Sequence, residues 1–285
     1  MENIKKNLKS DGYAVIENFL TSNEITDLKN EAANLIKSMP DQSNRTIFNT
    51  KTSEKRQNKD VNFLKSAQTV SYFYEEGALD AQGHLAVDPA ISLNKIGHAL
   101  HDLNPVFRKV TFGEKMKEIA FQLGFEDPAV VQSMYIFKNP GLGGEVVPHQ
   151  DGWFLHTEPM KVVGFWFALE DATVENGCLW FSKGSHKSGI HRRFIRNPQK
   201  DSEELLIYNA PAPTYQKSSF CAVPVPKGSL VLIDGQVVHF SEPNKSDQSR
   251  HAYTFHVVER KNTKYSEENW LQPTEKPFLS LYKDN

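Results

Sequence analysis

The sequence predicts a mainly β protein, a jelly roll with flanking helices, and three observations carry this prediction. After residue 129 the 285-residue chain contains short runs of β-branched and aromatic residues between Gly, Pro and Asn turns. Before that point helical patterns dominate. Eighteen Phe, 9 Tyr and 4 Trp provide for a packed core. Because nothing of low complexity divides the chain, we expect one domain over residues 1–285: a mainly helical buttress (1–128), a jelly-roll core (129–260) and a C-terminal segment (261–285).

The N-terminal part begins with a short alternating run and continues with helical patterns. The run DGYAVIENFL (11–20) is typical of an edge strand. In residues 21–39 a Thr-Ser-Asn sequence provides a helix cap, and apolar residues follow at helical spacing. LNKIGHALHDLNP (93–105) and FGEKMKEIAFQLGF (112–125) also look helical. We therefore expect three helical segments to support the sheets.

The second part of the chain supplies five candidate strands. They are AVVQSMYIFKN (129–139), KVVGFWFALED (161–171), NGCLWFS (176–182), GSLVLIDG (228–235) and RHAYTFHVVER (250–260). Short strands at such intervals are typical of an antiparallel sandwich or barrel.

Charge and composition exclude several classes of partner and location. Thirty-three basic against 35 acidic residues give a net charge of −2, so no global basic field exists to hold nucleic acid. Two cysteines, Cys178 and Cys221, are too few for a disulfide framework and suit a reducing compartment. Neither a signal-peptide pattern nor a long apolar run occurs, so we expect a cytoplasmic protein without a membrane span. Nothing in the sequence indicates an oligomeric state.

The tripeptide His-Gln-Asp is the first candidate for chemistry. His149 and Asp151 are two positions apart, and extended backbone at that spacing places both side chains on one face, as two ligands of one metal require. The same spacing arises by chance in a chain with 10 His. On this pair alone, a surface loop is an equally open interpretation.

The segment around His239 makes the pattern more specific. His239 closes a strand-like run, and Arg250 follows eleven positions later, at the start of the next run. Two imidazoles and one carboxylate on one face of an octahedral Fe(II) leave three positions for a bidentate co-substrate and O₂. A planar guanidinium pairs well with the distal carboxylate of 2-oxoglutarate. These residues indicate a non-haem iron oxygenase.

With these residues in place, the chain resembles the phytanoyl-CoA dioxygenase family over nearly its whole length. The matching motifs are DGYAVIENFLTSNEI, LNKIGHALHDLNP, HQD, EDATVENGCLWFSKGSHK and GSLVLIDGQVVH. The resemblance implies a double-stranded β-helix, a cupin-like jelly roll, and an Fe(II)/2-oxoglutarate-dependent dioxygenase. Such an enzyme converts 2-oxoglutarate and O₂ to CO₂ and succinate while it hydroxylates a small organic molecule.

The resemblance also implies a set of site residues. The iron ligands, which are the catalytic residues, would be His149, Asp151 and His239. Contacts to 2-oxoglutarate would come from Lys95, Met134, Trp166 and Arg250. Without the resemblance, Met134 and Trp166 read as core residues and Lys95 as a solvated helix lysine.

Three other functions share parts of this pattern. A related halogenase lacks the carboxylate ligand, and Asp151 argues against it. A cupin-like metal-dependent isomerase or hydrolase could use the same three ligands, although Arg250 and Lys95 disfavour a reaction without a co-substrate. A non-catalytic ligand-binding member of the fold is the third alternative, and the intact triad argues against it.

Several further motifs bear on the substrate. His186, in the segment ENGCLWFSKGSHKSG (175–189), is a candidate for substrate contact, although a rigid loop is the simpler interpretation. The basic segment HRRFIRNPQK (191–200) could meet a CoA phosphate, so an acyl-CoA substrate stays open beside a solvated loop. We expect structural roles for the four histidines His156, His191, His251 and His256.

Overall fold

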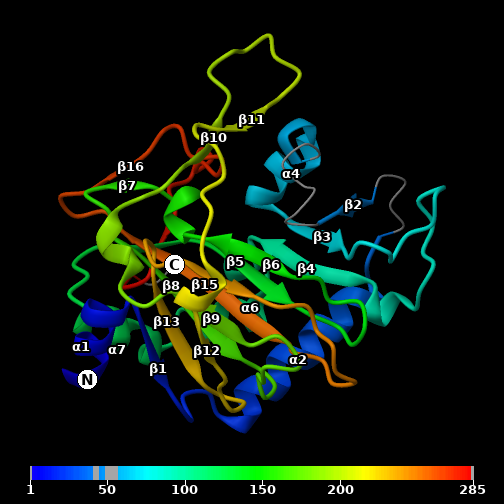
Figure 1. Cartoon of the computed structure of the whole chain (residues 1–285), viewed down its shortest axis with the longest axis horizontal. Helices are drawn as coiled ribbons and strands as arrows, with labels where there is room; N and C mark the ends of the chain where they lie inside the picture. Colours follow the sequence, from blue (N-terminus) through cyan, green and yellow to red (C-terminus); the bar gives the residue numbers. More distant parts are fainter. Residues whose placement is uncertain (1, 41–44, 49–56, 284–285) are drawn as a thin grey trace.

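The computed structural model describes residues 2–40, 45–48 and 57–283, and a large and a small antiparallel sheet lie at its centre (Figure 1). The large sheet runs β1 (Tyr13–Ile16), β13 (Leu230–Asp234), β8 (Val162–Ala168), β15 (Ala252–Glu259), β5 (Pro128–Ile136), β4 (Leu93–His98), β3 (Val70–Tyr74) and β2 (Thr46–Ile47), with β17 (Leu279–Ser280) also paired to β5. The small sheet runs β12 (Cys221–Val223), β9 (Leu179–Phe181), β14 (His239–Ser241) and β6 (Val146–His149).

These two sheets form the predicted double-stranded β-helix. All pairs in them are antiparallel except β2 with β3. Neighbours such as β8 and β15, or β6 and β14, are far apart in the sequence, as expected for a jelly roll. All five predicted strands are present, and the run at residues 11–20 does form an edge strand, β1, which pairs with β13 at one end of the large sheet.

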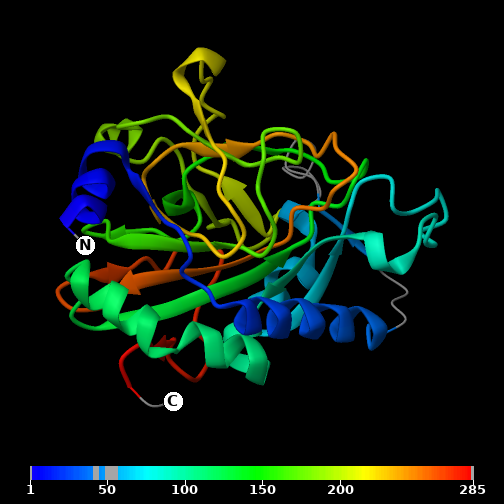
Figure 2. The same ribbon diagram turned by 90° about the horizontal axis from the view of Figure 1, so that it is seen from below.

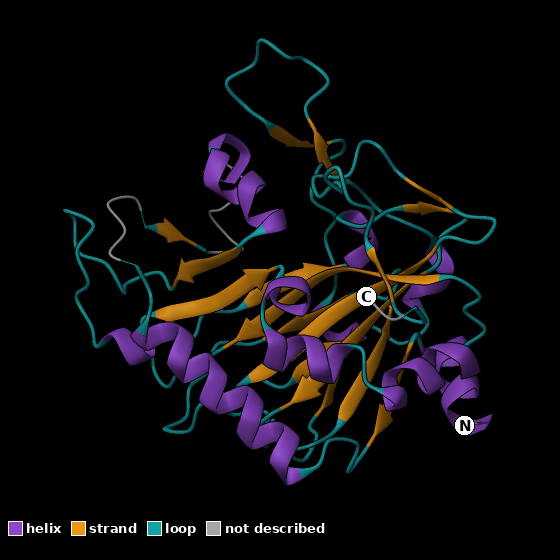
Figure 3. Cartoon of the chain, turned by 180° about the vertical axis from the view of Figure 1, so that it is seen from behind, coloured by secondary structure: helices purple, strands orange, loops and turns teal. Residues whose placement is uncertain are grey.

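Helices cover the outer face of the large sheet (Figures 2 and 3). They are α2 (Ser22–Lys37), α5 (Leu100–Leu103), α6 (Pro105–Thr111) and α7 (Glu114–Gln122). Helix α1 (Glu2–Asp11) lies against β1 and β13 at one end of the sheet, and the short α4 (Val61–Lys65) lies elsewhere. Thr21 caps α2 in a capping box with Glu24. Leu28 of α2 and Phe107 of α6 are fully buried in the same cluster as Phe165 of β8 and Phe255 of β15. The apolar faces of these helices therefore pack against the outer face of the large sheet. The inner face of the sheet remains to line a cavity.

The prediction of a helix over Leu93–Pro105 is wrong for its first half. Leu93–His98 forms strand β4, which pairs with β3 and β5, and helix α5 begins only at Leu100. Leu93, Ile96 and Leu100 have helical spacing, yet two flanking strands supply hydrogen bonds that outweigh this local pattern. Lys95 accordingly lies on a strand of the large sheet, and the described part of residues 1–128 contributes β1, β2, β3 and β4 as well as helices.

A second group of elements lies above the inner face of the sheet. The hairpin of β10 (Phe194–Arg196) and β11 (Leu206–Tyr208) and helix α4 rise on this side (Figure 1). The backbone N–H of Leu205 donates to the carbonyl of Asn58, so the hairpin contacts the segment before α4. The strands β7 (Thr157–Glu158) and β16 (Lys264–Tyr265) form a small separate ladder. Among the described residues, no helix is both long and apolar enough to cross a membrane.

Candidate active site

The residues predicted as metal ligands converge at one point between the two sheets. One ligand atom each from His149, Asp151 and His239 lies within 4.8 Å of the others. Asp151 Oδ1 is 3.7 Å from His149 Nε2 and 3.8 Å from His239 Nε2. This spacing suits three donors around one small divalent ion, so the structure brings together the triad that the sequence suggested.

Strand pairing explains the convergence. His149 ends β6 and His239 begins β14, and the two residues are direct partners in the antiparallel ladder. Gln150 keeps an extended backbone, so the alternation continues to Asp151, which opens a 3₁₀ turn over Asp151–Trp153. The Gln150 side chain lies on the opposite side and is fully buried, and its amide donates to the carbonyl of Gly189. The tripeptide is thereby fixed on both faces.

Both histidines present the correct ring nitrogen. His149 Nδ1 donates to the carbonyl of Val147 at 2.9 Å, and His239 Nδ1 donates to the carbonyl of Val237 at 3.1 Å. With the hydrogen on Nδ1, each Nε2 keeps its lone pair for a metal. Burial lowers the pKa of His239 to about 4, assisted by the neighbouring His149, so its imidazole is neutral at physiological pH.

Asp151 is held as a carboxylate. It is 7% exposed, and burial alone would raise its pKa. The imidazoles of His256 and His239 next to it outweigh burial and hold the pKa of Asp151 well below its usual value. The second carboxylate oxygen, Oδ2, lies 3.1 Å from His256 Nε2.

The triad opens into a cavity that contains all four predicted co-substrate residues. Lys95, Met134, Trp166 and Arg250 line it together with the triad. Met134 of β5 and Trp166 of β8 are both strand partners of Thr254 on β15, so they flank that residue in one row across the sheet. Neither is only a core residue, as composition alone would have suggested.

Arg250 is a buried cation that has no acidic partner among the described residues. It is 2% exposed, its Nε donates to the carbonyl of Gly177 at 3.1 Å, and its guanidinium lies 5.3 Å from the ring centroid of Trp166. Its Nη1 has no hydrogen-bond partner among the described residues, and none of their carboxylates forms an ion pair with it. A buried guanidinium in this state requires an anion, which a ligand can supply.

Lys95 is a second buried basic residue in the cavity lining, on strand β4. Its Nζ lies 3.4 Å from the ring centroid of Phe48 and 5.4 Å from that of Phe73. Burial lowers the pKa of Lys95 to about 7. Lys138 also lines the cavity, and its carbonyl accepts from the backbone N–H of Arg250; burial, assisted by the charge of Arg250, holds the pKa of Lys138 well below its usual value.

Polar residues of the cavity wall that the sequence analysis did not select include Lys138, Glu75, Ser241 and His98. Lys138 donates to the carbonyls of Gly144 and Glu242, and Glu75, with a pKa raised by burial, accepts from Asn94. Ser241, two residues after His239, and His98 also line the cavity. In the sequence, His98 and Ser241 could have been selected because they lie close to predicted site residues, His98 near Lys95 and Ser241 near His239. No comparable signal pointed to Lys138 or Glu75.

The remaining sequence candidates lie elsewhere. His186 is not part of the cavity wall and contacts the carbonyl of Lys9 on α1. His156, His191 and His251 also lie outside that wall, whereas His256 is part of it.

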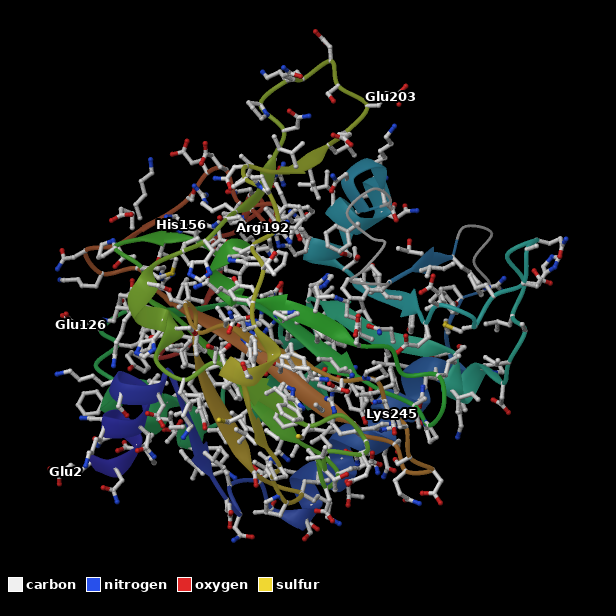
Figure 4. The ribbon with its side chains drawn as sticks, in the orientation of Figure 1. Glu2, Glu126, His156, Arg192, Glu203 and Lys245 are labelled. Atoms are coloured by element: carbon white, nitrogen blue, oxygen red, sulfur yellow. The ribbon has the colours of Figure 1, made fainter. Side chains whose placement is uncertain are left out.

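The arginines of residues 191–200 point in different directions. Arg192 lines the cavity, with its guanidinium 3.7 Å from the ring centroid of Tyr208. Arg193 pairs with Glu268 at 2.7 Å, and Arg196 donates to the carbonyl of Trp270. Figure 4 labels Arg192 at the base of the β10–β11 hairpin and Glu203 on the protruding loop of that hairpin. The segment is therefore not one exposed basic patch.

Sequence comparison identifies similar proteins over the whole chain. The family model described as phytanoyl-CoA dioxygenase (PhyH) matches residues 8–252. Phytanoyl-CoA dioxygenase domain-containing protein 1 of Bos taurus is 47% identical over 279 residues, covering 96% of each chain. Its homolog from Caenorhabditis elegans is 45% identical over 289 residues, covering 100% of each chain.

Comparison with solved structures supports the fold. The epimerase SnoN from nogalamycin biosynthesis, in complex with Fe³⁺, alpha ketoglutarate and nogalamycin RO, aligns with a TM-score of 0.63 at 16% identity, covering 99% of this chain and 93% of that one. EctD from S. alaskensis, with 2-oxoglutarate and 5-hydroxyectoine, aligns with a TM-score of 0.61 at 16% identity, covering 92% and 77%. At this identity the likeness concerns the double-stranded β-helix itself.

Proposed function

The chain belongs to the phytanoyl-CoA dioxygenase family, and from this premise we propose that it hydroxylates a small organic molecule while converting 2-oxoglutarate and O₂ to succinate and CO₂. The family is one of Fe(II)- and 2-oxoglutarate-dependent dioxygenases, which gives the class of the enzyme and its cofactors. The observation that carries the proposal is the His149–Asp151–His239 cluster, which opens on a cavity with an unpaired buried guanidinium.

The donor set fits Fe(II). Two neutral imidazole nitrogens and one carboxylate oxygen are the ligands of the facial triad, and both imidazoles already carry their hydrogen on the other nitrogen. In our proposal, His149, Asp151 and His239 hold the metal and leave its remaining positions toward the cavity. When bound, Fe(II) supplies the activation of O₂ that couples decarboxylation of the keto acid to oxidation of the substrate.

The cavity cations fit the co-substrate. We assign Arg250 to the far carboxylate of 2-oxoglutarate, because its Nη1 is buried without a partner in the described chain and a bidentate pair would satisfy it. Met134 and Trp166 form the floor beneath the co-substrate. Lys95, which lines the same cavity from β4, adds positive charge, and binding of a dianion favours its protonated form.

The walls of the cavity indicate the character of the primary substrate. Phe63, Phe154, Tyr208 and Trp270 line it and belong to or pack against one hydrophobic cluster, distinct from the cluster that contains Trp166. Such a wall suits a largely apolar molecule with few polar groups. We therefore place a small organic molecule there, and the dispersed arginines of residues 191–200 weaken the case for an acyl-CoA.

An anaerobic titration tests the proposal. Addition of Fe(II) and then 2-oxoglutarate to the metal-free protein should produce the weak visible charge-transfer band of a chelated keto acid. The band should be absent from Asp151→Ala and reduced at equal co-substrate concentration in Arg250→Ala.

The same experiment separates the alternatives. A cupin-like hydrolase or isomerase would bind metal without the keto-acid band. A non-catalytic member would show the band, and no succinate would follow on admission of O₂. Either result would contradict the proposed activity.

A further inference from the structure

We propose that His256, which is hydrogen-bonded to Gln132 and lies 3.1 Å from Asp151 Oδ2, is a positioning residue that fixes the metal-binding carboxylate by donating to this oxygen, which has no hydrogen-bond partner among the described residues; we call the three residues a relay. The inference deepens the proposed function, because it rests on Asp151 being a ligand. It assigns a role to a buried histidine that the sequence placed among structural residues.

The hydrogen-bond geometry determines which ring nitrogen of His256 carries the hydrogen. His256 Nε2 faces Asp151 Oδ2 at 3.1 Å, and a carboxylate oxygen can only accept. At the other end, Gln132 Nε2 lies 3.2 Å from His256 Nδ1, and an amide nitrogen can only donate. The contact with Gln132 places the ring hydrogen on Nε2, which faces an oxygen that has no hydrogen-bond partner among the described residues. His256 therefore has the opposite tautomer from His149 and His239.

This tautomer also excludes His256 from the ligand set. Its Nε2 carries the hydrogen and its Nδ1 lone pair accepts from Gln132, so neither nitrogen is left for a metal. The metal-facing atoms are Nε2 of His149 and His239 and Oδ1 of Asp151. In this relay Oδ2 is directed toward His256, so the carboxylate would present one oxygen to the metal rather than two.

The sheet is built to accommodate the relay. His256 on β15 pairs directly with Gln132 on β5 and with Gly164 on β8. A Cβ atom at Gly164 would lie 3.1 Å from Asp151 Oδ2 and 3.4 Å from His256 Nε2, which is tighter than ordinary contact. A residue without a side chain at position 164 thus leaves room for the carboxylate against the strand. His256 is only 4% exposed, so water does not compete for this contact.

The relay predicts that His256 controls metal affinity through orientation. Without His256, the Asp151 carboxylate would be free to rotate and would have to be ordered when the metal binds. Residues that orient a metal ligand typically contribute ~10–100-fold in metal affinity. His256 touches neither the metal-facing oxygen nor the other two ligands. Its effect should therefore be recovered by any side chain that donates to Oδ2 from the same place.

Imidazole NMR of the metal-free protein tests the tautomer. Long-range ¹H–¹⁵N spectra, with resonances assigned from single histidine variants, should show His256 with hydrogen on Nε2 and His149 and His239 with hydrogen on Nδ1. A spectrum in which His256 carries its hydrogen on Nδ1 alone would overturn the relay, whatever the enzyme activity.

Metal titration tests the positioning role. Co(II) affinity, measured by calorimetry on correctly folded protein, should fall ~10–100-fold in His256→Leu and return to within a few-fold of wild type in His256→Gln, whose amide can donate to Oδ2. His101→Leu is the matched control, because His101 is 5% exposed and bonds to Ser133, away from the triad. It should leave Co(II) affinity unchanged even if it lowers the melting temperature.

The outcomes separate this inference from the proposed function. If wild-type protein fails to bind Co(II) or Fe(II), the metal site itself is wrong. If the wild type binds and His256→Leu binds equally well, the relay is wrong and the metal site stands. Equal losses in His256→Leu and His256→Gln, with both variants folded, would show that the ring acts through packing and would also overturn the relay.

Discussion

His149 and His239 are directly opposed residues of one antiparallel strand pair, although 90 positions separate them in the sequence. Their ring centroids are 4.3 Å apart. Each ring is oriented by the carbonyl two residues before it, so both project Nε2 toward Asp151. The small sheet thus supplies two ligands from a single rung of its ladder, and the turn after β6 supplies the third.

Removal of a ligand should abolish turnover. Asp151→Ala and His239→Ala should eliminate metal-dependent consumption of 2-oxoglutarate, because two remaining donors hold iron weakly. His156→Ala is the control, since His156 Nε2 lies 3.8 Å from Glu158, outside the cavity wall. Succinate formation with saturating Fe(II) measures the effect. An inactive His156→Ala beside a fully active Asp151→Ala would refute the ligand assignment.

The sequence predicted the strands of the core and the approximate site because both depend on local patterns. The β-branched and aromatic runs became β5, β8, β9, β13 and β15. His149 and Asp151 lie close together, as their spacing predicted, because Gln150 is extended and the alternation of side chains reaches Asp151. The residues assigned by resemblance, including Met134 and Trp166, all line the cavity.

What the sequence did not predict depends on contacts between distant segments. Leu93–His98 has helical spacing, and only its position between β3 and β5 makes it a strand. His256 is 105 positions from Asp151 in the sequence, and its contact with Asp151 arises from the packing of β15 against the turn after β6. Lys138 approaches Arg250 because strand ends from separate parts of the chain meet.

Loss of the buried guanidinium should weaken co-substrate binding more than metal binding. Arg250→Ala should raise the Kd of 2-oxoglutarate roughly a hundredfold or more, because removal of one partner of a desolvated ion pair costs ~3–5 kcal/mol. Arg250→Lys should recover part of the affinity, and Arg108→Ala, which affects an exposed pair with Asp102, should change nothing. Anaerobic titration of the charge-transfer band provides the Kd. An unchanged Kd in Arg250→Ala would contradict the assigned role.

Lys95 should give the metal-free protein a distinctive pH dependence of stability. Burial lowers its folded-state pKa to about 7 from 10.5. Between these values the unfolded chain binds more protons at this lysine, so the free energy of unfolding should rise with pH by up to ~1.4 kcal/mol per unit. The penalty from this group is complete below the folded pKa and disappears above the unfolded one.

Lys95→Met tests this dependence. We compare the free energy of unfolding, measured with urea at about pH 7.5 and about pH 9.5. Over that interval it should rise by ~2 kcal/mol more in the wild type than in the variant. Lys276→Met, at an exposed position, is the control and should keep the wild-type slope. Parallel slopes for wild type and Lys95→Met would show that Lys95 is not desolvated in the folded protein.

Acyl-CoA thioesters should not be efficient substrates. The basic segment at residues 191–200 does not present a joint phosphate site, because Arg193 is paired with Glu268 and Arg196 donates to the carbonyl of Trp270. A panel of straight and branched acyl-CoAs should therefore leave succinate formation at the uncoupled background. Apolar small molecules without a nucleotide are the comparison set, chosen to match the aromatic wall of Phe63, Phe154 and Trp270.

The opposite result would have a recognisable signature. Exposed phosphate contacts weaken steeply with salt, so an acyl-CoA substrate bound by this segment should show a KM that rises with ionic strength. The double variant Arg193→Gln, Arg196→Gln should then raise that KM further and flatten its salt dependence. Stimulated succinate formation with such a salt-dependent KM would establish the acyl-CoA substrate. An unchanged KM in the double variant would instead place recognition of any active thioester at the cavity wall.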